Sequence, residues 1–385
     1  MNRFSAADHR ARDHYDVVVA GGGPAGCATA LTLLKAGRSV LLADAGTGPP
    51  KAGEALVSAS KLILDNLGVT DAVLTSGHLP WYGNLSAWGS PHLHAVDFIN
   101  DPYGHGWHLD RPLFDRQLRA ATRAAGAEVA EHSTARHPRR RPDGTWQVDL
   151  HDRQGTRRAV HCRWLVDATG RRAAIAVPAG AHRRTTDRLT AFHLTLPPAP
   201  TATDTRSLVE SAPDGWWYTT LLPSRRRLVS YFTDPDLPTA PHRTMDFHHR
   251  LRVTRHVIHQ TRPHALNPLQ KPRRAPAHST YLEQLHAPGW TATGDAAIAF
   301  DPLSSQGILT ALYTGLSAGQ AVDATLRGDH TALDTYTATI TTARAAYQHN
   351  HHAVQNQETR WPHHPFWARR RANPSPSSAE GITTP

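Results

Sequence analysis

The chain has 385 residues, of which 39% are hydrophobic and 19% charged, an ordinary composition for a globular protein and a length that suits two interleaved domains. Its formal net charge is +10, carried almost entirely by arginine. Since no nucleic-acid-binding motif accompanies this charge, we interpret it as a solvated basic surface, with attraction of an acidic leader peptide or a phosphate-bearing cofactor as the alternative.

No apolar run approaches the length of a membrane span, and the N-terminus lacks the apolar core of a secretory signal. The two cysteines, Cys27 and Cys162, have no metal-type spacing. We therefore expect a cytoplasmic protein with no membrane partner, no nucleic-acid partner and no metal.

The first part of the chain predicts a β-α-β unit. Residues 16–20 form a short apolar run typical of a buried strand, 27–36 have helical spacing, and 39–44 predict a second strand. Asp44 closes that second strand, where a carboxylate accepts hydrogen bonds from a ribose. Between the first strand and the helix lies a G-x-G-x-x-G motif made of Gly21, Gly22, Gly23, Pro24, Ala25 and Gly26.

In such a motif the first glycine allows a tight turn and the second lets the backbone approach a pyrophosphate. The third lets the helix and the strand pack closely, and the helix N-terminus attracts the anion. The motif therefore predicts dinucleotide binding, and the alternative is a glycine-rich turn with no ligand.

Helical and extended patterns alternate along the rest of the chain. Residues 78–109 are rich in Trp, His, Gly and Pro and show no long helical period. Residues 373–385 are rich in Pro and Ser and predict a disordered tail. Helices are predicted at 54–68, 111–125, 244–262, 305–326 and 331–349, hairpin strands at 128–166, a sheet at 185–235, and a short strand at 289–294.

Two later motifs, Asp167-Ala168-Thr169-Gly170 and Gly294-Asp295, each follow a predicted strand. Together with the glycine loop they resemble the glutathione-reductase-type flavoproteins, in the branch that holds aromatic hydroxylases and flavin-dependent halogenases. The resemblance implies FAD as cofactor, with Asp295 on the ribityl chain and Asp167 in the cofactor site.

The implied fold is α/β: a glutathione-reductase-type Rossmann FAD domain, interleaved with a β-sheet substrate domain and followed by a C-terminal helical region. The expected FAD-binding domain is discontinuous and comprises 15–77, 105–184 and 276–330. The substrate domain is expected at 78–104 and 185–275, and the helical region at 331–372.

Residues 301–308 are similar to the D-P-L-x-S-x-G-I segment of tryptophan-halogenase-like flavoproteins. We expect Ser304 or Ser305 to cap the helix that follows, and Gly307 to let the backbone approach the flavin ring. Gly53-Glu54 matches the G-E-x-L segment of the same group. Arg111 matches an arginine that contacts the cofactor in many relatives, with a surface charge as the alternative. The resemblance thus adds Glu54, Arg111, Pro302, Gln306, Gly307 and Ile308 to the cofactor-binding set.

Halogenases of this branch use a lysine that relays hypohalous acid to the substrate. Here no lysine occurs between Lys61 and Lys271, and arginine cannot replace it because it stays protonated. Ser304 stands where tryptophan halogenases place a glutamate, and 215–223 only approximate their W-x-W-x-I-P signature. We therefore predict an FAD-dependent monooxygenase that hydroxylates an indole or a phenol through a flavin C4a-hydroperoxide.

Residues 77–90, 104–110, 358–362 and 365–367 resemble a narrower subgroup, the flavoproteins that hydroxylate peptidyl tryptophan during maturation of quinone cofactors. This resemblance implies that the aromatic substrate is either a small molecule or a tryptophan in a peptide or protein. His78, His105 and Trp107 are the candidate catalytic residues. The alternatives are surface histidines and a tryptophan of the core.

Three other functions stay open: a halogenase with a non-standard relay, an FAD-dependent reductase on the same fold, and a flavin-binding assembly partner without turnover. The chain has no second G-x-G-x-x-G followed by a strand and an acid. The electrons are therefore expected either from NAD(P)H that binds transiently or from a partner flavin reductase.

Overall fold

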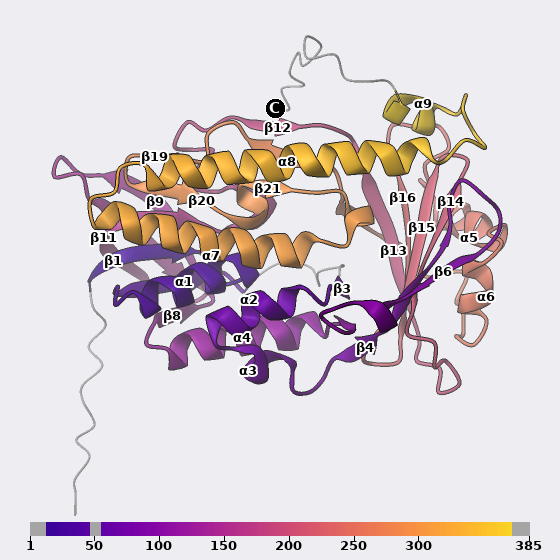
Figure 1. The fold of residues 1–385 in the computed structure, drawn as a ribbon, viewed down its shortest axis with the longest axis horizontal. Coiled ribbons are helices and arrows are strands. Elements are labelled where there is room, and N and C mark those ends of the chain that lie inside the picture. Colours follow the sequence, from indigo (N-terminus) through magenta and orange to yellow (C-terminus); the bar gives the residue numbers. More distant parts are fainter. Residues whose placement is uncertain (1–12, 47–54, 372–385) are drawn as a thin grey trace, which may run out of the picture.

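A mixed eight-stranded sheet forms the centre of one half of the protein (Figure 1). The computed structural model describes residues 13–46 and 55–371. The core of the sheet is parallel, in the order β20-β11-β1-β2-β8, and antiparallel strands complete it. These strands are β1 His14–Ala20, β2 Val40–Asp44, β8 Glu128–Glu131, β9 Ser133–Arg140, β10 Trp146–Asp152, β11 Arg157–Asp167, β19 His286–Ala287 and β20 Trp290–Ala292.

The predicted hairpin region at 128–166 is partly wrong. β9, β10 and β11 do pair antiparallel, but β8 pairs parallel with β2. The reason is that β8 follows a crossover helix, which places the strand beside β2 in the same direction.

Helix α1 (Pro24–Lys35) packs closely against the long helix α7 (Gly307–Leu326). A Cβ at Gly315 would lie 2.3 Å from the carbonyl oxygen of Ala25, and the hydroxyl of Thr29 donates to the Gly315 carbonyl at 2.9 Å. Small residues at this crossing therefore let the two helices approach at backbone distance. The other helices of this half are α2 Ser60–Leu67, α3 Thr70–Leu74, α4 Arg111–Ala124 and α8 Ala332–Asn356.

Three helix boundaries differ from those predicted. The helix expected at 54–68 begins at Ser60, after a two-residue strand at 55–56. Helix α7 begins at Gly307, because Ser305 has a left-handed φ of 52° that a helix cannot contain. Helix α8 continues to Asn356. The predicted tail at 373–385 lies outside the described residues.

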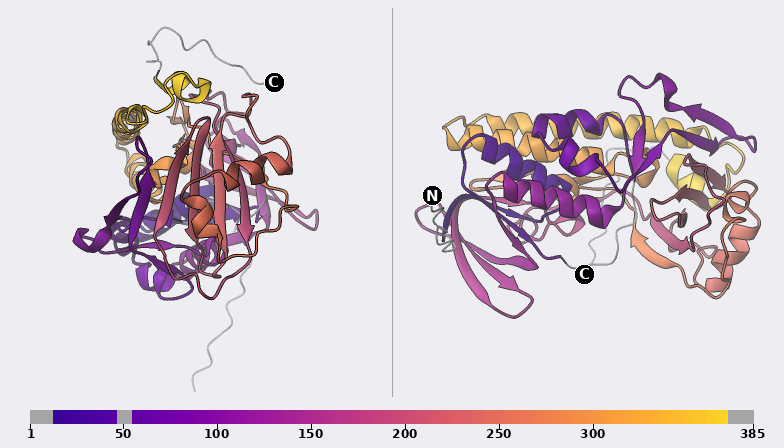
Figure 2. Two further views of the ribbon diagram at one scale, coloured as in Figure 1. Left: turned by 90° about the vertical axis from the view of Figure 1, so that its right-hand side faces the viewer. Right: turned by 90° about the horizontal axis from the view of Figure 1, so that it is seen from below.

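The second half is built on a seven-stranded sheet in the order β17-β13-β16-β15-β14-β5-β6 (Figure 2). Its strands are β5 Gly83–Ala87, β6 His94–Asp97, β13 Thr190–Leu196, β14 Ser207–Ala212, β15 Gly215–Leu221, β16 Arg227–Thr233 and β17 Arg273–Pro276. This confirms the predicted sheet at 185–235.

Strand alternation gives this sheet two different faces. Phe192 and Leu194 lie in the cluster with Phe247 and Leu251 of α5 (Thr244–Arg252), so this is the outer face. Ala191 lies in the cluster with Leu303, which directly precedes α7, so the other face of the sheet is turned toward the first half.

The single helix predicted at 244–262 is two helices, α5 and α6 (Val257–Thr261). The carboxylate of Glu210, from β14, accepts the backbone N–H groups of Arg255, His256 and Val257 at 2.6 to 2.9 Å. This buried carboxylate satisfies the free N–H groups at the start of the second helix and so stabilises the break.

Two small sheets connect the halves. One is β3 (Ala55–Leu56), β7 (Gly106–His108) and β4 (Leu79–Trp81); the other is β12 (Arg183–Thr185), β18 (Thr280–Leu282) and β21 (Ile298–Ala299). Four 3-10 turns complete the elements: η1 Phe98–Asn100, η2 Gly170–Arg172, η3 Gly294–Ala296 and η4 Pro302–Ser304.

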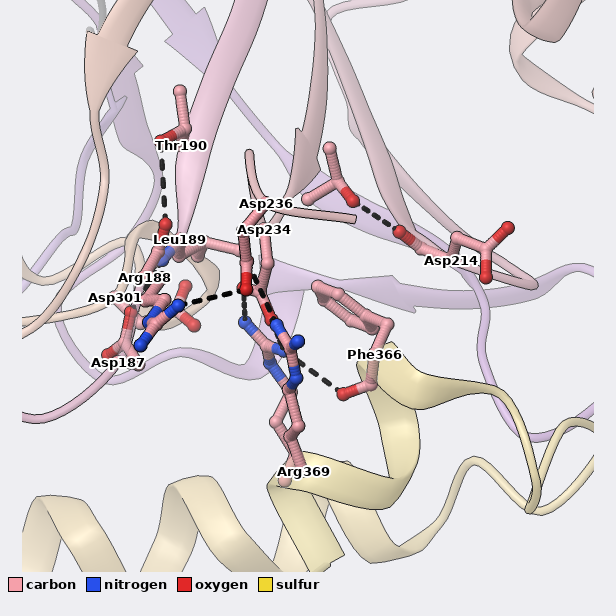
Figure 3. Close-up of polar contacts among 12 residues, drawn as sticks. Asp187, Arg188, Leu189, Thr190, Asp214, Asp234, Asp236, Asp301, Phe366 and Arg369 are labelled. Carbon is pink, nitrogen blue, oxygen red and sulfur yellow. Dashed lines mark hydrogen bonds and ion pairs between the residues drawn. The ribbon is translucent and has the colours of Figure 1, made fainter. Parts of the chain in front are cut away.

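The last described helix, α9 (Pro365–Arg371), fastens the end of the chain to the large sheet (Figure 3). Arg370 pairs with Asp234 at 2.7 Å, and Arg369 pairs with Asp236 at 2.9 Å. Asp234 is only 2% exposed, so its charge depends on these arginines. None of the described helices is long and apolar enough to cross a lipid bilayer.

Candidate active site

The three sequence motifs meet at the carboxyl ends of β1, β11 and β20. A Cβ at Gly21, whose φ is 116°, would lie 2.1 Å from the carbonyl oxygen of Ala168. A Cβ at Gly294 would lie 2.6 Å from the Cβ of Ala25, and the N–H of Thr293 donates to the carbonyl of Asp167 at 2.9 Å. Open α/β sheets bind ligands at this edge.

The start of α1 has the geometry of an anion site. Gly23 is the N-cap and Pro24 the first helical residue, so no side chain caps the helix. A Cβ at Gly26 would lie 1.8 Å from the carbonyl oxygen of Gly21, which shows how tightly the loop folds onto the helix. The first-turn N–H groups are therefore available to a phosphate.

Asp44 lies beside this loop at the end of β2. Its carboxylate pairs with Nη1 of Arg119 at 3.2 Å, and the same nitrogen donates to the carbonyl of Gly22 at 3.3 Å. Arg119, on α4, thus fixes the carboxylate next to the glycine loop.

Asp167 lies at the end of β11. Its side chain is fully buried and accepts four hydrogen bonds, from the N–H and hydroxyl of Thr169 and from the N–H groups of Ile175 and Ala176, at 2.7 to 3.0 Å. The carboxylate therefore shapes the loop after β11. Its predicted place in the cofactor site stays a prediction.

Asp295, by contrast, is half-exposed in η3. It forms an ion pair with Nε of Arg171 at 3.7 Å, and Arg171 also donates to the carbonyls of His278 and Phe300. Arg171 therefore ties η2, η3 and the segment before η4 together around an accessible carboxylate. Nearby Arg183 has a pKa lowered first by burial and then by Arg171.

Side chains of α8 hold the segment 301–308 in place. Asp301, only 2% exposed, accepts from the N–H of Leu303 and from Nε2 of His351, both at 2.9 Å, and its own N–H donates to the Tyr347 hydroxyl at 2.9 Å. Burial and the Asp301 charge raise the pKa of Tyr347.

The predicted serine caps of α7 are wrong. Gln306 is the N-cap, with no side-chain hydrogen bond to the helix. The Ser304 hydroxyl accepts from the N–H of Gln306 at 3.3 Å and donates to the Asp301 carbonyl at 3.1 Å. Pro302, Gln306 and Gly307 are exposed, whereas Ile308 is buried. A Cβ at Gly307 would meet no described atom within 4 Å.

Arg111 begins α4 and is buried, with Nη2 at 3.3 Å from the Asp115 carboxylate. Its contact with a cofactor stays a prediction. Glu54 lies outside the described residues.

The predicted catalytic residues divide into two cases. The Nδ1 of His78 accepts from the N–H of Asp110 at 3.1 Å, and its Nε2 donates to the Val73 carbonyl at 2.9 Å. Both ring nitrogens therefore contact backbone groups, and the predicted role of His78 as the base stays a prediction. Burial lowers its pKa, which fits a neutral ring.

His105 and Trp107 lie together at β7, with ring centroids 4.8 Å apart. The Nδ1 of His105 donates to the Gly106 carbonyl at 2.8 Å, and the ring is half-buried. Trp107 is also half-buried and packs against the main core. Their catalytic roles stay predictions.

The inner face of the large sheet presents a polar row across three strands. Tyr218, Ser230 and His193 are cross-strand neighbours in register. Beside them Trp216 stacks on Phe232 with centroids 3.9 Å apart. Trp216, Phe232 and Ser230 are buried, so of this row only Tyr218 and His193 keep exposed surface.

Comparison with known proteins decides the family. A family model described as an FAD binding domain matches residues 14–350. The chain belongs to this FAD-binding family. The flavoprotein is 29% identical over 379 residues to a protein named putative FAD-dependent oxidoreductase LodB, from Marinomonas mediterranea, with 94% of this chain and 98% of that protein covered.

The same relationship extends to halogenases. A tryptophan 2-halogenase from Chondromyces crocatus is 25% identical over 81% of this chain, which spans 62% of that halogenase. Among solved structures, the myxobacterial chondrochloren halogenase CndH superposes with a TM-score of 0.83 at 22% identity, covering 96% of this chain and 88% of that one. The peptidyl tryptophan dihydroxylase QhpG superposes with a TM-score of 0.77 at 24% identity, covering 96% and 81%.

The protein is thus an FAD-dependent oxidoreductase with the tryptophan-halogenase-like fold, as the sequence motifs predicted. The described residues fit the cofactor: uncapped N–H groups for its pyrophosphate at α1, a carboxylate for its ribose at Asp44, and open space for its ring at Gly307.

Two site residues, Arg119 and Arg171, escaped the sequence motifs. They hold Asp44 and Asp295, and neither stands in a motif of its own. His108 is fully buried, with Nε2 2.8 Å from the Thr205 carbonyl and 2.9 Å from the Thr220 hydroxyl, so it joins β7 to β15. Burial lowers its pKa to about 4.

Proposed function

We propose that the flavoprotein is a monooxygenase that hydroxylates an indole or a phenol, with a tryptophan side chain of a peptide or protein as the favoured substrate. The observation that carries this proposal is the lysine-free stretch from residue 62 to residue 270. This stretch includes β4, β7 and six of the seven strands of the large sheet, so none of these strands offers an amine to relay a halogen.

The chain's own residues bind the cofactor, orient the substrate and shield the site from water. The α1 N-terminus and Asp44 would hold the cofactor, and Arg171 positions Asp295 to contact it. Reduced FAD would supply the two electrons with which one atom of O2 is transferred to the substrate and the other is released as water.

The remaining steps belong to the side chains near the sheet. The half-buried Tyr218, which lies beside the buried Trp216–Phe232 stack, would orient the aromatic ring through its hydroxyl. His105 donates from Nδ1 to a backbone carbonyl, which leaves its Nε2 to accept the proton of an indole N–H or a phenol.

The decisive experiment supplies the holoenzyme with a flavin reductase, NADH and labelled ¹⁸O₂. It offers a tryptophan-containing peptide, free tryptophan or a phenol, in buffer with bromide. The proposal expects a product that contains one or more ¹⁸O atoms and no bromine. A brominated product would establish a halogenase, and turnover of the substrate without oxygen would establish a reductase.

The electron source is a separate part of the proposal. We propose that reduction comes from NAD(P)H bound transiently or from a partner flavin reductase, since the sequence lacks a second dinucleotide motif. Stopped-flow absorbance of the bound FAD after mixing with NADH or NADPH alone distinguishes the two. Rapid bleaching indicates direct reduction, and its absence indicates a reductase.

A further inference from the structure

The edge of the large sheet borders a cavity that the proposed chemistry does not use. It has a volume of about 850 Å³ and lies between β13, β17 and the start of α5. Its polar wall consists of His193, His242, Arg243, Lys271, Arg273 and Arg274, and no carboxylate belongs to the described lining.

Among the described residues, the cations of this wall have no carboxylate partner, although acidic side chains lie nearby. Nearby Arg188 and Arg369 each form an ion pair with Asp236 at 2.9 Å. Within the described ranges, by contrast, neither Arg273 nor Lys271 pairs with a carboxylate, and the same holds for Arg243 and Arg274. Four like charges around one cavity repel one another, and an anion placed among them would relieve that repulsion.

Two aromatic side chains shape the wall. The guanidinium of Arg274 lies over the ring of Phe192, 5.0 Å from its centroid. His193 is the cross-strand neighbour of Arg273, and its pKa is lowered first by burial and then by that arginine. The imidazole therefore stays neutral at pH 7 and leaves the arginines as the source of positive charge.

The cavity reaches both faces of the sheet at its edge. Arg274 and Phe192 belong to the outer face, whereas His193 belongs to the inner face with Ser230 and Tyr218. Two residues along the extended strand, roughly 7 Å, separate His193 from Ala191, which packs in the cluster with Leu303. The cavity therefore borders the inner face, which is turned toward the first half of the protein.

We propose that this cavity binds acidic side chains of a peptide or protein substrate whose aromatic residue is oxidised in the cleft. This inference rests on the proposed function, because it requires a substrate with a chain of its own. A dinucleotide fits less well, since the described lining contains no glycine where backbone could approach a phosphate, and Arg274 already covers the Phe192 ring.

The test measures binding of a fluorescein-labelled hexaglutamate peptide to the FAD-loaded protein by fluorescence anisotropy. The cavity variant carries Arg273→Glu and Arg274→Glu. The matched control carries Arg136→Glu and Arg140→Glu on β9, two exposed arginines in the other half of the protein, so both variants have the same net charge.

We expect saturable binding whose Kd rises about tenfold or more in the cavity variant and less than about twofold in the control, because only the first variant changes charges in contact with the probe. Higher salt should weaken binding to the unmodified protein. If the affinity for hexaglutamate fell equally in both variants, binding would depend only on the net charge of the protein, and the proposal would be overturned. Stronger competition by NADPH than by unlabelled hexaglutamate would assign the cavity to a phosphate-bearing cofactor.

This readout is independent of turnover. If the probe binds as expected but no oxygenated product forms from any aromatic compound, the monooxygenase assignment fails and the acidic-segment site stands. If oxygenation occurs while the probe binds no more tightly than a neutral hexaglutamine peptide, the cavity proposal fails and the chemistry stands.

Discussion

The glycines of the G-x-G-x-x-G loop are required by close contacts as well as by backbone angles. Gly21 combines a φ of 116° with a carbonyl oxygen 2.1 Å from where a Cβ would be. The carbonyl oxygen of Ala168 cannot move away easily to make room for a Cβ, because it belongs to the loop that Asp167 organises through its hydrogen bonds.

We predict that Gly21→Ala lowers the FAD content of the purified protein severalfold and reduces the free energy of unfolding by about 1–3 kcal/mol. The absorbance ratio of flavin to protein and urea unfolding measure the two effects. Gly144→Ala is the control, since Gly144 has a φ of 83° but no atom within 4 Å of the added Cβ. Equal effects of both substitutions would show that backbone strain alone matters.

His108 makes stability depend on pH. Its pKa is about 4 in the folded protein, against an ordinary value of 6.5, so between these values the unfolded chain binds a proton that the folded chain does not. Stability should therefore be complete above pH 6.5 and fall as the pH decreases toward 4, by up to about 3 kcal/mol from this residue.

Urea unfolding of the unmodified protein and of His108→Gln at pH 7 and pH 5 tests this expectation. The variant should lose less stability between the two pH values, because glutamine does not titrate. If both proteins lose the same amount, His108 is not the group responsible.

Among the elements, α9 shows how a short helix can hold a large sheet. Its arginines place two positive charges against Asp234 and Asp236 (Figure 3). The indole of Trp367 donates to the Ala212 carbonyl at 2.9 Å. The helix therefore joins the ends of β14 and β16.

We predict that Arg370→Ala destabilises the protein by about 3 kcal/mol, because Asp234 would stay buried with only Arg369 to compensate it. Arg139→Ala serves as control: its pair with Asp149 is largely exposed, and the expected cost is about 0–1 kcal/mol. Thermal unfolding of the two variants measures the contrast. A loss below that of the control would mean that Asp234 is neutral in the folded protein.

At the scale of elements, sequence patterns located most helices and strands but placed some of their first and last residues wrongly. Residues 244–262 have one helical period, yet the Glu210 carboxylate, which is distant in sequence, stabilises a break at 253–256. Likewise the start of α7 depends on the left-handed Ser305, a conformation that a serine does not signal.

For the whole molecule, the cofactor should contribute to stability, since its predicted ligands come from strands and helices distant in sequence. We predict that removal of FAD lowers the Tm. At an FAD concentration near 100 times its Kd the difference should be roughly 3 °C for a protein of this size. Differential scanning fluorimetry of the apoprotein with increasing FAD measures this, and a Tm independent of FAD would contradict the cofactor site described above.

The sequence by itself determined the β-α-β unit, the FAD-binding family and the lysine-free stretch. The reason is that the spacing of glycines, the position of an acidic residue at the end of a strand, and residue identity are local properties. The tertiary structure alone decided that Asp167 organises a loop, that both ring nitrogens of His78 contact backbone groups, and that Arg119 and Arg171 hold the site's carboxylates. It also gathered Arg243 and Arg273 at one cavity. These roles depend on partners brought together from distant parts of the chain, and a hydrogen bond or a shared charge has no signature in the spacing of either partner.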